Sequence, residues 1–353
     1  MIDKITGFLE NAIERHVFPG CSVAIIANKQ RWCGSFGAYT YEPGSQRVLT
    51  DTIYDVASIT KAVPVSSLAL KLIGEGMTGM DKPLIDLVPE FTGGYRESIT
   101  VRHLLTQTLD FGFRLSDLKH LGGEAVLNAI LAAPMRSAPG EVYSYANATS
   151  ILLGLFLERL TGVPLDEAAQ FYLFGPLAME STTFHPDRFD SAKIVPTEDD
   201  PWRGRVIRAE VHDESAFLLR PGIVGSAGLF STASDLLSFA AMLLSGGTVK
   251  GKRLFSPDML AMMHTDALPG RPDRTGYGWE LNQPVFMGKL CSGTSFGKTG
   301  FTGCSMLIDP ERAAAVVLLS NHTWPHRRKD RSIINGLRAG LADIVFGHID
   351  GAD

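Results

Sequence analysis

The sequence of 353 residues lacks the features that would place it among the disulfide-rich, metal-binding or membrane-spanning proteins. Its four cysteines stand singly in apolar segments, without C-x-x-C pairs or metal-ligand spacing. No run of about 18 apolar residues is present for a membrane span. The N-terminus has no uninterrupted apolar core of the kind found in a signal peptide. We therefore expect a cytoplasmic protein without a membrane partner.

The chain also lacks a strong charge of either sign. Its formal net charge is −5, and the one dense basic run, residues 326–331, is interpreted as a solvated surface segment. This charge excludes the electrostatic footprint of a nucleic-acid-binding protein. With 45% hydrophobic and 20% charged residues, and without a repeat or low-complexity linker, the sequence is typical of a globular chain with a large core.

Strand patterns are concentrated at the two ends of the chain. Segments 21–27 and 31–36 read as paired strands around a polar turn, and segments 305–308 and 313–320 read as a hairpin of buried strands. The middle shows apolar residues at helical spacing. We predict an α/β (α+β) fold with an antiparallel sheet flanked by helices. It would be a single domain, 1–353, with one lobe from 1–75 plus 275–353 and an inserted helical lobe, 76–274.

The most informative stretch is 54–61, in which Ser58 and Lys61 stand three residues apart. The chain contains two further S-x-x-K matches, Ser116/Lys119 and Ser295/Lys298, but only the first precedes an apolar helical stripe. A serine hydroxyl needs a neighbouring base to act as a nucleophile, and a lysine one turn later lies on the same helix face. An amine serves as that base only when it is neutral, which burial favours. We predict Ser58 as the nucleophile, rather than as a helix cap.

Two more motifs stand where a serine/lysine hydrolase needs them. Tyr145 and Asn147 form a Y-x-N motif after a Pro-Gly turn, and a tyrosine beside a lysine can relay a proton as base and then acid. The asparagine is expected to hydrogen-bond the lysine and the substrate together. In the second motif, Lys298-Thr299-Gly300-Phe301, the lysine and threonine are expected to bind a substrate carboxylate, and the glycine to allow close approach.

Four other features of the sequence are weaker evidence for a functional site. A phosphate-binding P-loop around Lys298 would need a glycine at position 292, which is Ser292. His322 and His326 lack the glutamate of a zinc motif, so we expect no metal and no cofactor. His212 either lines the pocket or is a structural histidine. The E-x-x-L-N match at 124–128 is attributed to chance, since it reads as a plain amphipathic helix.

The order S-x-x-K, Y-x-N, K-T-G resembles the serine β-lactamase and penicillin-binding-protein superfamily, in particular its class C and esterase-like branch. Segments 103–108 and 225–235 also resemble that branch. The resemblance implies that Ser58 is the nucleophile, Lys61 and Tyr145 the acid/base pair, and Asn147 an orienting group. It further implies that Lys298 and Thr299 bind a carboxylate, and that the N–H groups of Ser58 and Phe301 form the oxyanion hole.

From this resemblance we expect a serine hydrolase that cleaves a β-lactam or related amide through an acyl-serine intermediate. Its partner would be a small-molecule substrate that bears a carboxylate. A carboxylesterase for small esters and a non-catalytic binding module with the same fold are the alternatives, and the sequence leaves the true substrate and the oligomeric state open. Two departures from the family pattern are Pro64, which predicts a kink in the nucleophile helix, and Gln107 with Leu109-Asp110 in one wall of the site.

Overall fold

The computed structural model describes residues 1–222, 224–271 and 274–351. In these ranges the central element is a six-stranded antiparallel sheet with the strand order β2-β1-β12-β11-β10-β9. The strands are Gly20–Ala27 (β1), Gln30–Gly37 (β2), Glu280–Leu281 (β9), Phe296–Thr299 (β10), Ser305–Asp309 (β11) and Ala314–Ser320 (β12). Cys21 on β1 lies opposite Ser320 on β12. The prediction that the two chain ends share one sheet is therefore confirmed.

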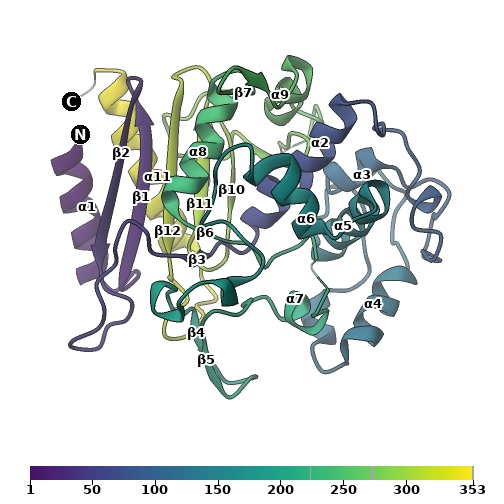
Figure 1. The fold of residues 1–353 in the computed structure, drawn as a ribbon, viewed down its shortest axis with the longest axis horizontal. Helices are drawn as coiled ribbons and strands as arrows, with labels where there is room; N and C mark the ends of the chain where they lie inside the picture. The colour runs from purple at the N-terminus through teal and green to yellow at the C-terminus, as the bar shows by residue number, and fades with distance from the viewer. Residues whose placement is uncertain (223, 272–273, 352–353) are drawn as a thin grey trace.

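Helices cover both faces of the sheet (Figure 1). The α-helices of the described residues are α1 (Ile2–Glu14), α2 (Ser67–Gly74), α3 (Val101–Leu105), α4 (Gly123–Leu131), α5 (Asn147–Thr161), α6 (Leu165–Ala169), α7 (Glu214–Leu218), α8 (Ala233–Leu244), α9 (Pro257–His264), α10 (Pro284–Met287) and α11 (Ser332–Ile349). Successive strand side chains point to opposite faces. Val316 and Leu318 accordingly belong to the core cluster that includes residues of α1 and α11, while Val317 and Leu319 belong to the cluster that includes residues of α2, α5 and α8. This two-sided cover explains why β12 is buried throughout.

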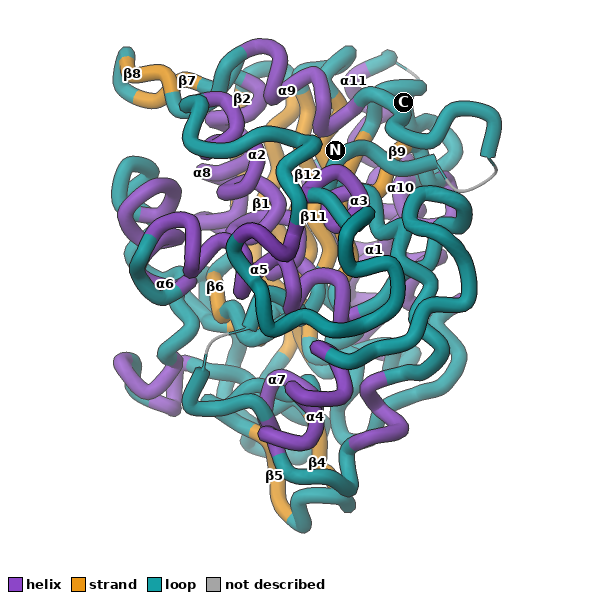
Figure 2. The backbone as a smooth tube through the Cα atoms, turned by 90° about the vertical axis from the view of Figure 1, so that its right-hand side faces the viewer, coloured by secondary structure: helices purple, strands orange, loops and turns teal. Residues whose placement is uncertain are grey.

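The middle of the chain is mainly helix and loop, as expected. Helices α3, α4, α5 and α6 lie on the side of the molecule away from α1 and α11, and loops dominate that side (Figures 1 and 2). Helix α8 differs from the others, because it packs against β1 and β12 although it falls within the range 76–274 assigned to the helical lobe. Short two-stranded pairs complete the fold: Tyr54–Asp55 (β3) with Phe230–Ser231 (β6), Glu198–Asp200 (β4) with Arg205–Ile207 (β5), and Thr248–Val249 (β7) with Lys252–Arg253 (β8).

Among the described residues no single helix has both the length and the apolar composition to cross a membrane. In the same part of the chain, the consecutive segments Asn147–Thr161 and Leu165–Phe174 are long and apolar enough for a membrane span only when they are taken together. These two segments are bent by 75° to each other.

The helix that follows Ser58 accommodates Pro64 in an unusual way. Residues Lys61–Ser66 form a π-helical segment that continues directly into α2. The N–H of Ser67 bonds to the carbonyl of Ala62, five residues earlier. Because proline has no N–H to donate, a wider turn lets the helix continue past it. Pro64 therefore lies inside the helix and does not end it.

Candidate active site

The nucleophile candidate sits on a tight turn between strand β3 and the π-helical segment. Ala57, directly before Ser58, has a φ of 48°, which is an unfavourable conformation for an alanine. The carboxylate of Asp55 stabilises this turn, since its Oδ1 accepts the N–H of Ala57 at 2.8 Å. Burial raises the pKa of the Asp55 carboxyl, although the N–H groups of His212 and Ala57 oppose that effect. The turn presents a half-buried Ser58 at the beginning of the helix.

Lys61 lies within hydrogen-bond distance of the Ser58 hydroxyl. Its Nζ donates to Ser58 Oγ at 2.9 Å and to the carbonyl of Ser226 at 2.6 Å. Only 3% of Lys61 is exposed, so the amine is held in one position by these two oxygens. The predicted proximity of serine and lysine is present in the structure.

Tyr145 lies between two lysines. The Nζ atoms of Lys61 and Lys298 are 5.2 Å and 4.4 Å from the centre of its ring. Burial alone would raise the pKa of the phenol, but Lys298, Lys61 and a hydrogen bond with Ser58 outweigh it and leave the pKa below its ordinary value. A phenol with a lowered pKa beside a serine hydroxyl is suited to proton transfer.

Lys298 differs from its expected role, because it already has an anionic partner. Its Nζ lies 2.7 Å from Glu280 Oε1, and Glu280 is the neighbour of Gly297 across strands β9 and β10. Burial alone would lower the pKa of Lys298, but Glu280 and Tyr145 raise it above its ordinary value. Lys298 therefore remains a cation, yet a substrate carboxylate would have to share it with Glu280. Thr299, at the end of β10, is half-buried.

The backbone of Gly300 and Phe301 lies close to the nucleophile turn. A side chain at Gly300 would lie 2.4 Å from the carbonyl of Val56, so only glycine permits this approach. The buried guanidinium of Arg338 donates to the carbonyl of Gly300 at 2.8 Å and thereby orders the turn. Within the described residues, the N–H groups of Ser58 and Phe301 donate to no backbone carbonyl. Both donors are thus available to a ligand.

Asn147 does not make the contact with the lysine that the sequence analysis expected. It is the first residue of α5, and its Nδ2 donates to Asp213 Oδ2 at 3.0 Å and to Ser215 Oγ at 3.4 Å. Asp213 in turn caps helix α7 through the N–H of Ala216. The side chain of Asn147 is therefore drawn toward the start of α7, because the cap supplies a carboxylate acceptor there.

Gln107, which stood out only as a departure from the family pattern, supports the tyrosine segment. Its Oε1 accepts the N–H of Ala146 at 3.1 Å, its Nε2 donates to Ser150 Oγ at 3.1 Å, and its carbonyl accepts the N–H of Ser144 at 2.8 Å. These bonds hold the chain on either side of Tyr145. No sequence pattern indicates this role, because it depends on contacts between residues about 40 positions apart.

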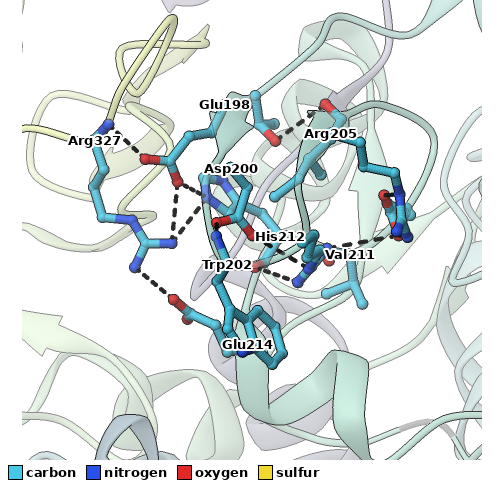
Figure 3. A network of polar contacts seen from close by, with 12 residues as sticks. Glu198, Asp200, Trp202, Arg205, Val211, His212, Glu214 and Arg327 are labelled. Carbon is cyan, nitrogen blue, oxygen red and sulfur yellow. Dashed lines mark hydrogen bonds and ion pairs between the residues drawn. The ribbon is translucent and has the colours of Figure 1, made fainter. Parts of the chain in front are cut away.

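His212 proves to be a buried structural residue (Figure 3). Its Nε2 lies 2.7 Å from Glu198 Oε2, and Arg327 reaches both Glu198 and Glu214. Burial alone would raise the pKa of Glu198, but its hydrogen bonds with His212 and the N–H of Arg327, and the charge of Arg327, bring it below the ordinary value. The His212 ring packs edge-on against the Phe301 ring, with 4.7 Å between the ring centres. The Arg327 guanidinium carbon lies 4.9 Å from the centre of the Phe301 ring. This network supports one wall of the site from behind.

A cavity of about 760 Å³ opens beside Tyr145. Its lining combines aromatic rings with charged and polar groups, among them Phe111, Phe113, Arg114, Asn147, Asp213 and Arg331. The volume and mixed lining would suit a substrate side group that has both apolar and polar atoms.

Comparisons with known proteins agree with this geometry. The sequence profile of the family described as Beta-lactamase matches residues 5–339. A protein of Escherichia coli O157:H7 named "Putative D-alanyl-D-alanine carboxypeptidase" is 31% identical, over 88% of this chain and 79% of its own length. A protein of the same name from Salmonella heidelberg (strain SL476) is 27% identical, over 92% and 83%.

Two solved structures share the fold. One is "EstCE1, a hydrolase with promiscuous acyltransferase activity", with a TM-score of 0.77, 22% identity and 98% of each chain covered. The other is the octameric penicillin-binding protein homologue from Pyrococcus abyssi, with a TM-score of 0.76, 22% identity and coverage of 99% of this chain and 77% of that one. The resemblance drawn from the three motifs is confirmed. The chain belongs to the beta-lactamase family, has the β-lactamase/transpeptidase-like fold and is a serine hydrolase that acts on amides or esters.

Proposed function

We propose that the protein cleaves an amide bond, in a β-lactam or in a peptide that ends in a D-amino acid, through an acyl-enzyme on Ser58. The observation that carries the proposal is the arrangement of Ser58, Lys61 and Tyr145: the buried amine of Lys61 donates to Ser58 Oγ at 2.9 Å and lies 5.2 Å from the centre of the Tyr145 ring. The names of the relatives that match most of the chain support a substrate with a terminal D-alanine.

In the proposed reaction Tyr145, as a phenolate stabilised by Lys61 and Lys298, takes the proton of Ser58. The Oγ then attacks the carbonyl carbon, and the N–H groups of Ser58 and Phe301 bind the oxyanion. When the tetrahedral intermediate collapses, the leaving amine takes the proton from Tyr145. A water molecule then gives a proton to the Tyr145 phenolate and attacks the acyl carbon, and Tyr145 passes that proton to Ser58 Oγ as the ester bond breaks and the acid leaves. Thr299 and Lys298 would bind the leaving group's carboxylate.

The pairing of Lys298 with Glu280 favours a second candidate, the hydrolysis of a small carboxylic ester. An ester without a carboxylate needs no cation for its binding, so the pairing of Lys298 with Glu280 does not weaken the binding of such a substrate. For a carboxylate-bearing amide, Glu280 would repel the substrate unless the lysine bridges both anions.

A comparison of three substrates separates the candidates. Purified protein and its Ser58→Ala variant are assayed with nitrocefin, with a peptide that ends in D-Ala-D-Ala and with p-nitrophenyl butyrate. The amide proposal expects turnover of nitrocefin or release of D-alanine, both absent in Ser58→Ala. Turnover of the ester alone would replace the amide proposal with the esterase. Amide turnover that persists in Ser58→Ala would contradict the assigned nucleophile.

A further inference from the structure

We propose that Asp55 positions the oxyanion hole, because it bonds to both of the segments that carry the two N–H donors. The inference rests on the proposed function, in which the N–H groups of Ser58 and Phe301 bind the oxyanion. Asp55 is 1% exposed and does not reach the reacting atoms through any contact in the structure. Its role would be to hold the donors in place, and not to take part in the chemistry.

The first bond fixes the donor of Ser58. The peptide that carries this N–H joins Ala57 to Ser58, so its direction depends on the backbone conformation of Ala57. That residue has a φ of 48°, which an alanine adopts only when surrounding contacts stabilise it. The Asp55 carboxylate supplies such a contact by accepting the N–H of Ala57 at 2.8 Å. Loss of this bond would allow the turn to relax and the donor to rotate.

The second bond fixes the donor of Phe301. Thr302 follows Phe301 directly, is fully buried, and donates from Oγ1 to the backbone carbonyl of Asp55 at 2.9 Å. Gly300, on the other side of Phe301, packs against the carbonyl of Val56. The turn around Phe301 is therefore attached to the nucleophile turn through Asp55 and its neighbour. The separation of the two donors depends on this attachment.

A third bond connects Asp55 to the buried polar network (Figure 3). Asp55 Oδ2 accepts the backbone N–H of His212 at 2.8 Å, and the ring of His212 packs against the ring of Phe301. Glu198 and Arg327 contact Nε2 of the His212 ring and hold this ring in place. Each carboxylate oxygen of Asp55 thus has its own N–H donor. An asparagine can replace only one of these oxygens as an acceptor, while its amide group faces the other N–H.

The test uses substitutions at Asp55 and Thr302, with Asp309→Asn as a matched control. Asp309 is equally buried and bonds to Ser292, Ser295 and Arg312 at the far end of β11, away from both donors. Measured quantities are kcat and KM with the best substrate of the panel, the Ki of phenylboronic acid, whose serine adduct mimics the tetrahedral intermediate, and the melting temperature.

Asp55→Asn should lower kcat by about 10- to 100-fold, somewhat less than the loss of a whole oxyanion donor, and leave KM within about threefold. The Ki of phenylboronic acid should rise by a similar factor. Thr302→Val should lower kcat by about 10-fold, and Thr302→Ser, which keeps the hydroxyl, should restore it. Asp309→Asn should lower the melting temperature and keep kcat.

Two results would overturn the inference. In one, the Asp55 and Thr302 variants lose stability but keep kcat and the boronate Ki within about twofold of the wild type. In the other, Asp309→Asn loses as much kcat as Asp55→Asn. If Asp55→Asn does not fold, the comparison of Thr302→Val with Thr302→Ser decides. A wild-type protein that turns over no substrate and binds no boronate would refute the proposed function itself, which is a different outcome.

Discussion

Replacement of Lys298 by methionine should move the pH dependence of the reaction, because this cation lowers the pKa of Tyr145. Two unit charges 4.4 Å apart, the distance from Lys298 Nζ to the ring centre, interact by about 4 kcal/mol at an effective dielectric constant of about 20. Glu280 offsets part of this charge, and 43% of Tyr145 is exposed to solvent. We therefore reduce the interaction to about 1.5 kcal/mol, or about one pKa unit.

The sign of the effect follows from the role of Tyr145 as a base. The phenolate is the active form, so kcat/KM rises as the pH passes the pKa of Tyr145. Without Lys298 that pKa is higher, and the rising limb should move by about one unit toward alkaline pH. On the rising limb, below the pKa of Tyr145, the variant would lose about 10-fold in rate, and at high pH it would recover most of it.

The assay is kcat/KM from pH 5 to pH 11 with an uncharged ester and with nitrocefin, so that carboxylate binding is separated from proton transfer. Lys289→Met, at an exposed lysine after α10, is the matched control and should leave the profile unchanged. A Lys298→Met profile that is lower by the same factor at every pH, with an unmoved limb, would refute the reasoning. The lysine would then act on substrate binding and not on Tyr145.

Three further predictions concern neighbouring groups. Lys61→Ala and Tyr145→Phe should each cost about 10² to 10⁴ in kcat, and the double variant should be scarcely worse than the poorer single one, whereas losses that multiply would mean independent action. Glu280→Gln should free Lys298 and lower KM for nitrocefin but not for p-nitrophenyl butyrate; equal effects on both substrates would argue against carboxylate recognition by Lys298. Gln107→Ala should lower the free energy of unfolding by about 1 to 2 kcal/mol, measured by denaturant titration, through the loss of its side-chain hydrogen bonds with Ala146 and Ser150, and should lower kcat as Tyr145 loosens. A destabilised variant with unchanged kcat would show that Gln107 has no bearing on Tyr145.

The parts of the fold that the sequence predicts are those set by local patterns. The strand patterns of segments 21–27 and 313–320 predicted strands of one sheet, and in the structure the two strands lie side by side in it. Motif order then predicted that Ser58, Lys61, Tyr145 and Lys298 meet, and in the structure they do. The spacing of Ser58 and Lys61 and the motif at the end of β10 are local patterns, so they can be recognised from the sequence alone.

The partners of these residues are not local, and the sequence did not show them. Glu280 reaches Lys298 through the pairing of a two-residue strand, β9, with β10, and it stands in no motif. Asn147 was expected beside the lysine but bonds to Asp213, because the cap of α7 is brought to it by the tertiary fold. Asp55 was not among the predicted site residues. For His212 the sequence left two possibilities open, and its burial against Glu198 decides for the structural one.

The most direct test of the central claim is the intact mass of the protein after incubation with a fluorophosphonate or a penicillin. The acyl-enzyme mechanism predicts one covalent adduct per chain, mapped by peptide fragmentation to Ser58 and absent from a folded Ser58→Ala variant. An adduct on another residue, or a well-folded wild-type protein that stays unlabelled by both reagents, would contradict it.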